Sequence, residues 1–142
     1  MPDAADNVVD WAEFSRMRAE LGASFVRILG YFHEDGEKAV DAIEAAMHAR
    51  EPARLVLPAH TLKSEARQFG AMRLAAIAEE IEDAGRHAVE TRLFPDHVLP
   101  QVAQLRGLYR TTLDQLLAET NPLAQRGSFG QKAPSNQGFG RL

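Results

Sequence analysis

One histidine near the middle of the chain, His60, has neighbours that suit phosphoryl chemistry. When residues 52–69 are placed on a helix at about 100° per residue, Lys63, Ser64 and Arg67 fall within roughly 60° of His60. The opposite side carries an apolar stripe with the spacing of a buried bundle seam: Leu55, Ala59, Leu62, Ala66 and Phe69. The pattern therefore predicts a helix that buries one face and displays an imidazole on the other.

The neighbours of His60 narrow the chemistry that it could perform. Histidine titrates near neutral pH, so a useful fraction of the ring is uncharged and nucleophilic. Lys63 and Arg67 would favour that neutral form and would meet the charge of a phosphoryl group arriving on the ring. Ser64 is small enough to leave room beside the imidazole. No Asp or Glu stands three or four positions from His60, so nothing in this stretch resembles a catalytic triad.

The same stretch resembles the signature of histidine phosphotransfer (HPt) domains. The matching residues are His60-Thr61-Leu62-Lys63-Ser64, then Phe69-Gly70-Ala71 and Leu74. The resemblance covers about residues 20–90 and implies a four-helix bundle that accepts a phosphoryl group from an aspartate of one receiver domain. The group would then pass to an aspartate of another receiver. On this basis His60 would be the phosphoacceptor and Lys63 the positive neighbour that the family usually has.

Two positions depart from the family's pattern. Ser64 stands where glycine is usual, so a hydroxymethyl group lies beside the ring and could donate a hydrogen bond to phosphoryl oxygens. Glu65 stands where a small residue is usual, about 140° away from His60, and could alter the choice of partner. Two residues are candidates for partner contact: Gln68, at the edge of the displayed face, and Val56, an apolar residue near it.

Periodicity along the rest of the chain predicts an all-α fold: an antiparallel up-down four-helix bundle with an additional N-terminal helix and a flexible C-terminal tail. Asp10 can cap a first helix that begins at Trp11 and that Gly22 ends or bends. The bundle helices are expected over residues 24–49, 52–69, 72–87 and 95–119. The corresponding domain boundaries are a flexible lead-in over 1–9, the bundle over 10–120 and the tail over 121–142.

Three details of these helices are open to test. Gly36 interrupts the pattern of the second helix, which we interpret as a local defect in one continuous helix. Pro58 should bend the third helix, or alternatively mark its start. The fourth helix carries charged residues that we expect to face water: Glu79, Glu80, Glu82, Asp83 and Arg86.

Composition and missing motifs limit the functional classes. The chain has 142 residues, a formal net charge of −4 and no cysteine, which argues against a general nucleic-acid binder, disulfides and thiolate metal sites. No apolar run approaches a membrane span and the N-terminus lacks a signal pattern, so we expect a cytoplasmic protein without membrane contact. No Gly-rich phosphate loop is present, so the protein is expected to be a phosphocarrier rather than an ATP-dependent enzyme.

The leading hypothesis is therefore a stand-alone relay protein, expected to be monomeric. Its partners would be a sensor histidine kinase and the receiver domains of response regulators or hybrid kinases. It would need no cofactor of its own, because the Mg²⁺ for transfer would come with the receiver. Two alternatives remain: the dimerisation and phosphotransfer module of a histidine kinase, or a helical adaptor that binds receivers without transferring phosphate.

Overall fold

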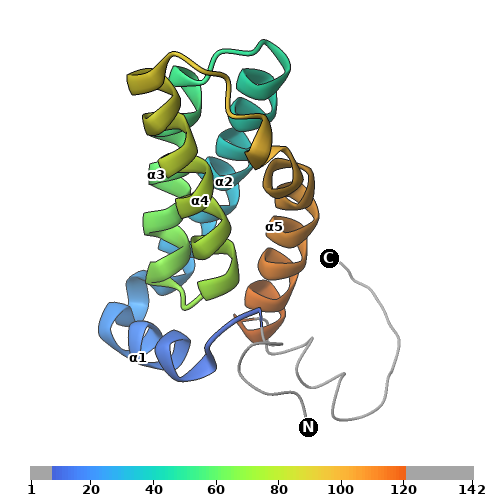
Figure 1. Cartoon of the computed structure of the whole chain (residues 1–142). Helices are drawn as coiled ribbons and strands as arrows, with labels where there is room; N and C mark the ends of the chain where they lie inside the picture. Colours follow the sequence, from blue (N-terminus) through green and yellow to red (C-terminus); the bar gives the residue numbers. More distant parts are fainter. Residues whose placement is uncertain (1–7, 121–142) are drawn as a thin grey trace, which may run out of the picture. The chain divides into compact units, whose positions relative to one another are not determined.

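The computed structural model describes residues 8–120 of the chain, and every regular element in that part is helical (Figure 1). The elements are α1 (Trp11–Leu21), η2 (Gly22–Ser24), α2 (Phe25–His48), α3 (Ala53–Gln68), α4 (Met72–Thr91), η3 (Asp96–Val98) and α5 (Leu99–Thr120). Residues 1–7 and the expected tail over 121–142 lie outside the described residues. Val8 and Val9, which the expected lead-in included, are buried, so the packed chain begins before Asp10. Within the described residues no helix is both long and apolar enough to cross a membrane.

Helices α2, α3 and α4 and the part of α5 up to Thr112 form the antiparallel up-down bundle that the periodicity predicts, with α1 as the additional N-terminal helix (Figure 1). In the unit that ends at Thr112, α3 packs against both α2 and α4. The buried stripe of α3 consists of the predicted residues: Leu55, Ala59, Leu62 and Ala66 within the helix, and Phe69 at its end. Because this face of α3 packs into the core, His60 on the opposite face of the helix points away from it.

A chain of aromatic contacts links α1, α2, the end of α3 and α5. Phe14 packs on Phe25, Phe25 on Phe69, Phe69 on Phe32, and Phe32 on Tyr109, with ring centroids 5.4–5.7 Å apart. Three of these four contacts are edge-to-face, the arrangement in which the positive ring edge meets the negative ring face. The contacts fix the relative positions of the helices that surround α3.

Gly36 has a packing role that the sequence did not reveal. α2 is continuous from Phe25 to His48, as expected, but Gly36 is buried and lies against the ring of Tyr109. The Tyr109 hydroxyl shares its one hydrogen between two acceptors, the carbonyl oxygens of His33, at 2.9 Å, and Phe32, at 3.2 Å. The missing side chain at Gly36 therefore gives Tyr109 the room to attach α5 to α2.

The turn between α3 and α4 holds the start of α1. Gly70 has φ 77°, and its carbonyl oxygen accepts a hydrogen bond from the Asp10 backbone N–H at 2.7 Å. The Asp10 side chain in turn accepts from the backbone N–H groups of Ala12 and Glu13, which confirms the predicted N-cap. A side chain at Gly70 would lie 2.7 Å from the Asp10 carbonyl oxygen, so glycine is required both for the turn and for this contact.

Several predicted helix ends differ from the structure. Pro58 lies inside α3, so the alternative that the helix begins there is wrong. α4 continues past the expected end at His87 to Thr91, and Arg92 follows in a left-handed conformation with φ 60°. α5 begins at Leu99 rather than at Pro95, because the residues after Pro95 form η3.

Candidate functional site

The imidazole of His60 lies on the outside of α3 and is half exposed, with 50% of its side-chain area accessible. Ala59 and Leu62, which flank His60 in the sequence, are completely buried. Their packing fixes α3 in the orientation that directs His60 outward. The predicted display of His60 on a helix with a buried opposite face is therefore present.

A carboxylate from the neighbouring helix holds the ring. Glu82 Oε2 on α4 lies 3.0 Å from Nδ1 of His60, and only 4% of the Glu82 side chain is exposed. Lys63 Nζ lies 2.7 Å from the other oxygen, Oε1. Arg86, one turn further along α4, reaches Oε2 through Nη2 at 2.8 Å and Nε at 3.1 Å. The expectation that Glu82 faces water is wrong: it is a buried carboxylate shared by three nitrogen-bearing side chains.

The protonation state of Glu82 determines which ring nitrogen of His60 carries hydrogen. Burial alone would raise the pKa of Glu82, but the ion pair with Lys63 and the hydrogen bonds with Arg86 and His60 outweigh it and lower the pKa to about 2. At neutral pH Glu82 is therefore ionised and can only accept hydrogen bonds. Nδ1 of His60 must then be the donor, and in the neutral ring the lone pair lies on Nε2.

The three predicted neighbours of His60 on α3 differ in their exposure and in their ion-pair partners. Lys63 is largely buried, with 14% of its side chain exposed, and its charge is directed at Glu82. Arg67 is half exposed and pairs with Glu79 of α4 at 2.9 Å. Ser64 is exposed on the same helix. The structure thus joins His60 and Lys63 through a shared carboxylate, whereas it directs Arg67 to a separate ion pair.

The predicted partner-contact residues lie on either side of His60. Val56 is half-buried, and its side chain lies against the position of Gly85 on α4. Gln68, at the last position of α3, is also half-buried. Their role in partner contact stays a prediction. Leu57, which the sequence analysis did not select, is the more accessible apolar residue here, with 72% of its area exposed.

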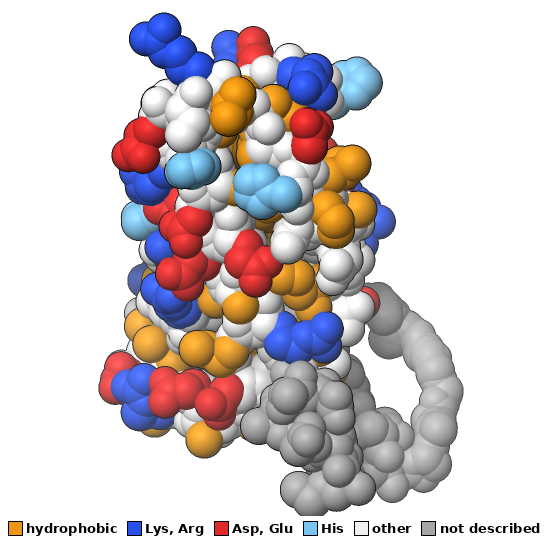
Figure 2. All heavy atoms as spheres, viewed as in Figure 1, with side chains coloured by type: hydrophobic (Ala, Val, Ile, Leu, Met, Phe, Trp, Pro, Cys, Tyr) orange, Lys and Arg blue, Asp and Glu red, His pale blue; other side chains and the backbone are white. Residues whose placement is uncertain are grey.

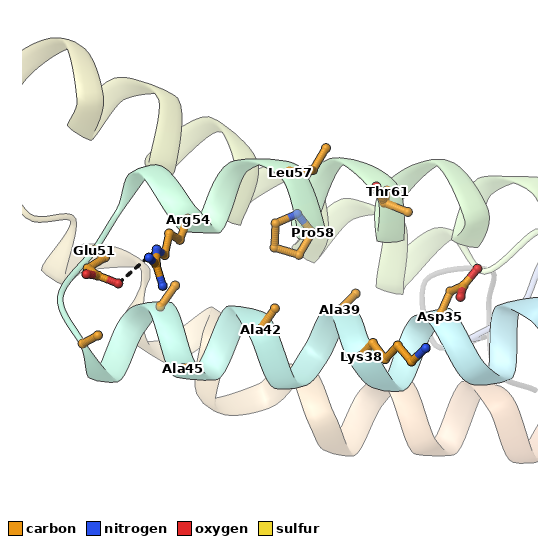
Figure 3. Close-up of a pocket in the computed structure, with 12 residues that line it drawn as sticks. Asp35, Lys38, Ala39, Ala42, Ala45, Glu51, Arg54, Leu57, Pro58 and Thr61 are labelled. Atoms are coloured by element: carbon orange, nitrogen blue, oxygen red, sulfur yellow. Dashed lines mark ion pairs between the residues drawn. The ribbon is translucent and has the colours of Figure 1, made fainter.

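A groove of about 530 Å³ runs between α2 and α3 (Figure 3). Its floor is made of alanines of α2 and of the residue that follows this helix: Ala39, Ala42, Ala45, Ala46 and Ala49. Leu57, Pro58 and Thr61 of α3 line it from the other side. Asp35 and Lys38 stand toward one end, and the ion pair of Glu51 with Arg54 stands at the other.

Glu65 is a titratable group that the site does not use. Its Oε1 oxygen is buried and forms no hydrogen bond within the described residues. Burial, and then the negative charge of Asp35, raise the pKa of Glu65 to about 7. The fold therefore favours the protonated form of the Glu65 carboxyl group more than water does.

A Glu65→Gln variant should accordingly be more stable than wild type above neutral pH. Because the folded pKa of Glu65 lies above the ordinary value of 4.5, its carboxyl group costs no stability below pH 4.5 and costs progressively more as pH rises to about 7. The difference should approach roughly 3 kcal/mol at pH 8 and vanish near pH 4. Urea unfolding of the two proteins across this range measures it, with the exposed Glu34→Gln as control. If the stability difference between wild type and Glu65→Gln did not change with pH, the raised pKa of Glu65 would be contradicted.

The two groups that the sequence analysis missed, Glu82 and Arg86, both come from α4. A signal for Glu82 exists in hindsight, because it lies four residues after the buried Ala78 and eight after Leu74. That spacing places it on the inward side of α4. Arg86, four residues later, then follows as its partner on the same helix.

The surface in Figure 2 carries acidic, basic and histidine side chains in mixture, with apolar side chains between them. Among the described residues, no group of three or more histidine or acidic side chains has the geometry to hold a metal ion. The site is therefore defined by one displayed imidazole and by the charges around Glu82.

Comparison with known proteins identifies the class of protein that this fold and site define. The model of the Hpt domain matches residues 27–120, so the chain belongs to the Hpt family, the histidine phosphotransfer proteins of phosphorelays. Among solved structures, the chain is similar to the crystal structure of histidine-containing phosphotransfer protein B (HptB) from Pseudomonas aeruginosa PAO1. The TM-score is 0.71 and the identity 19%, over 85% of this chain and 97% of that one. No curated protein sequence matches the chain.

Proposed function

We propose that this protein relays a phosphoryl group between receiver-domain aspartates, or from a sensor histidine kinase to a response regulator, through His60. The observation that supports this most directly is the contact between Nδ1 of His60 and the buried, ionised Glu82. With Nδ1–H committed to Glu82, the lone pair of the neutral ring is on Nε2, and half of the side chain is open to a partner.

The transfer step follows from that arrangement. Nε2 attacks the phosphorus of a phosphoaspartate on the receiver, the bond between phosphorus and the aspartate oxygen breaks, and its electron pair stays on the aspartate. Glu82 keeps the imidazole in the orientation and tautomer that this attack needs, as a carboxylate does for a catalytic histidine. The protein itself acts as a phosphocarrier, and Mg²⁺ is expected on the receiver domain rather than here.

We assign the groove between α2 and α3 to the receiver partner, as the place where one of its helices docks. The groove adjoins the acceptor, because Leu57 and Thr61 are three residues before and one residue after His60 on α3. Its alanine floor lets the backbone of a partner helix approach closely, and Leu57 offers an apolar contact. The charged pairs toward its two ends would orient an amphipathic helix with charged ends.

Ala42→Arg, on the floor of this groove, should slow phosphotransfer from a receiver by about tenfold or more, because the added side chain fills the docking site. Phosphorylation of the same variant by the small donor phosphoramidate should stay at the wild-type rate, since that donor needs no docking. Ala103→Arg is the matched control, because Ala103 is an exposed alanine of α5 that lies outside this groove. Equal transfer rates for the Ala42→Arg and Ala103→Arg variants would remove the groove from the docking surface.

The experiment that tests the proposed function uses purified receiver domains from the host, each labelled with ³²P on aspartate. Mixing them with the full chain should move label to the protein rapidly for the physiological partner and slowly for the others. The label should be acid-labile and base-stable, as expected for a phosphorus–nitrogen bond. Binding of a receiver without any transfer would instead favour the adaptor alternative, and a dimer in solution would favour the kinase-module alternative.

A further inference from the structure

The contacts of Glu82 bear on the second half of the relay, when the phosphoryl group leaves His60. In the empty protein Nδ1–H donates to Glu82 Oε2 at 3.0 Å. When Nε2 gains phosphorus, the ring becomes cationic if it keeps that hydrogen and neutral if it loses it to solvent. The charge of the group at Nδ1 decides between these two forms, because a carboxylate stabilises the cationic ring and a neutral acceptor does so far less.

We propose that Glu82 keeps the proton on Nδ1 of His60 while Nε2 carries the phosphoryl group, and thereby makes the imidazole a good leaving group for the next transfer. This inference rests on the proposed function. It assigns Glu82 as a positioning residue: it contacts the ring, and the phosphoryl group is on the opposite nitrogen.

The chemistry balances without an external acid. The acceptor aspartate oxygen forms a bond to phosphorus, the P–Nε2 bond breaks, and its electron pair returns to Nε2. A ring that still carries Nδ1–H departs as neutral imidazole, which is the form in which it started. A ring that had lost this hydrogen would depart as imidazolate, a far more basic and therefore poorer leaving group. Glu82 accepts the same hydrogen bond at every stage.

The surroundings of Glu82 suit this role. Its side chain is 4% exposed, so solvent screens its field at the ring only weakly. The charged groups that face it are Lys63 of α3 at Oε1 and Arg86 of α4 at Oε2, the oxygen that His60 also contacts. These two cations keep Glu82 ionised. They also offset part of its negative charge, so that Glu82 stabilises a cationic imidazole less than it would without them. Removal of Arg86 should therefore increase the stabilisation that Glu82 gives to the protonated imidazole.

The test is a pH titration of the phosphorylated protein by ³¹P NMR, after loading with phosphoramidate. The full-length His60→Gln variant identifies the resonance of His60 among those of other phosphorylated histidines. In Glu82→Gln, which keeps an oxygen of similar size, the pH midpoint of that resonance should fall by about one unit or more. In Arg86→Met the midpoint should rise. Transfer from loaded Glu82→Gln to a receiver should slow about tenfold near pH 8.

The outcomes separate the inference from the function that it rests on. Equal midpoints in wild type and a folded Glu82→Gln, as judged by circular dichroism, would overturn the inference and leave His60 as the acceptor. If Glu82→Gln does not fold, Arg86→Met decides, because an unchanged or lower midpoint there contradicts the role of Glu82. Absence of a His60-dependent resonance in the wild-type protein, together with no label from any receiver, would instead reject the proposed function.

Discussion

A His60→Gln variant should fold like wild type and accept no phosphoryl group from any receiver. The ring is half exposed, and within residues 8–120 its one hydrogen bond is to Glu82, so the loss of stability should be small. Glutamine has a similar length but no nucleophilic nitrogen. The rate of labelling should therefore fall by at least about a thousandfold, below detection in a standard transfer assay.

The comparison needs a second histidine as control. His48 is exposed near the end of α2, on another helix, and His48→Gln should be labelled at the wild-type rate. Receiver binding should persist in both variants, because neither removes groove residues. Acid-labile, base-stable label that remains on His60→Gln would transfer the acceptor role to another histidine and end the present assignment.

The largest effect on stability is expected at Gly36. A β-carbon there would lie 2.4 Å from Cε1 and 2.6 Å from the hydroxyl oxygen of Tyr109. Tyr109 cannot move away cheaply, because it is completely buried, packs against Phe32 and shares its hydroxyl hydrogen between two α2 carbonyl oxygens. Gly36→Ala should therefore destabilise the protein by about 2–3 kcal/mol or more, as overpacking of a rigid core does.

Gly30→Ala is the matched control for this measurement. Gly30 lies on the same helix, but a β-carbon at its position has no neighbouring atom within 4 Å. The substitution should stabilise the protein by about 0.5–1 kcal/mol, because alanine is the better helix former. Urea unfolding followed by circular dichroism measures both. If the two substitutions changed the unfolding free energy by the same amount and in the same direction, helix propensity rather than contact with Tyr109 would explain the effect at Gly36.

The features that could be predicted from the sequence are those encoded within one helix. The apolar seam of α3 and the outward direction of His60 follow from residues a few positions apart, and the Asp10 cap follows from local turn chemistry. The Glu82 contact joins residues 22 positions apart on two helices, and no spacing within α3 indicates it. The run of charged residues on α4 predicts a solvent-facing surface, whereas the phase of the helix points one of them, Glu82, inward.

Gly36 and Leu57 show the same limit. Whether a glycine inside a helix is a defect or a contact point depends on what packs against it, which here is a tyrosine 73 positions later in the chain. An exposed leucine becomes informative only when the neighbouring helix is seen to form a groove beside it. The extra length of α4 and the late start of α5 likewise depend on how the chain turns between them.

The shared carboxylate also gives the empty and loaded proteins different electrostatics. Two cations, Lys63 and Arg86, and one anion, Glu82, leave the empty acceptor site with a single net positive charge when the ring is neutral. A phosphoryl dianion on a ring that keeps its proton cancels that charge. We therefore expect the unloaded form to attract an anionic phosphorylated donor with an affinity that falls as ionic strength rises, and the loaded form to release the spent donor with little dependence on salt.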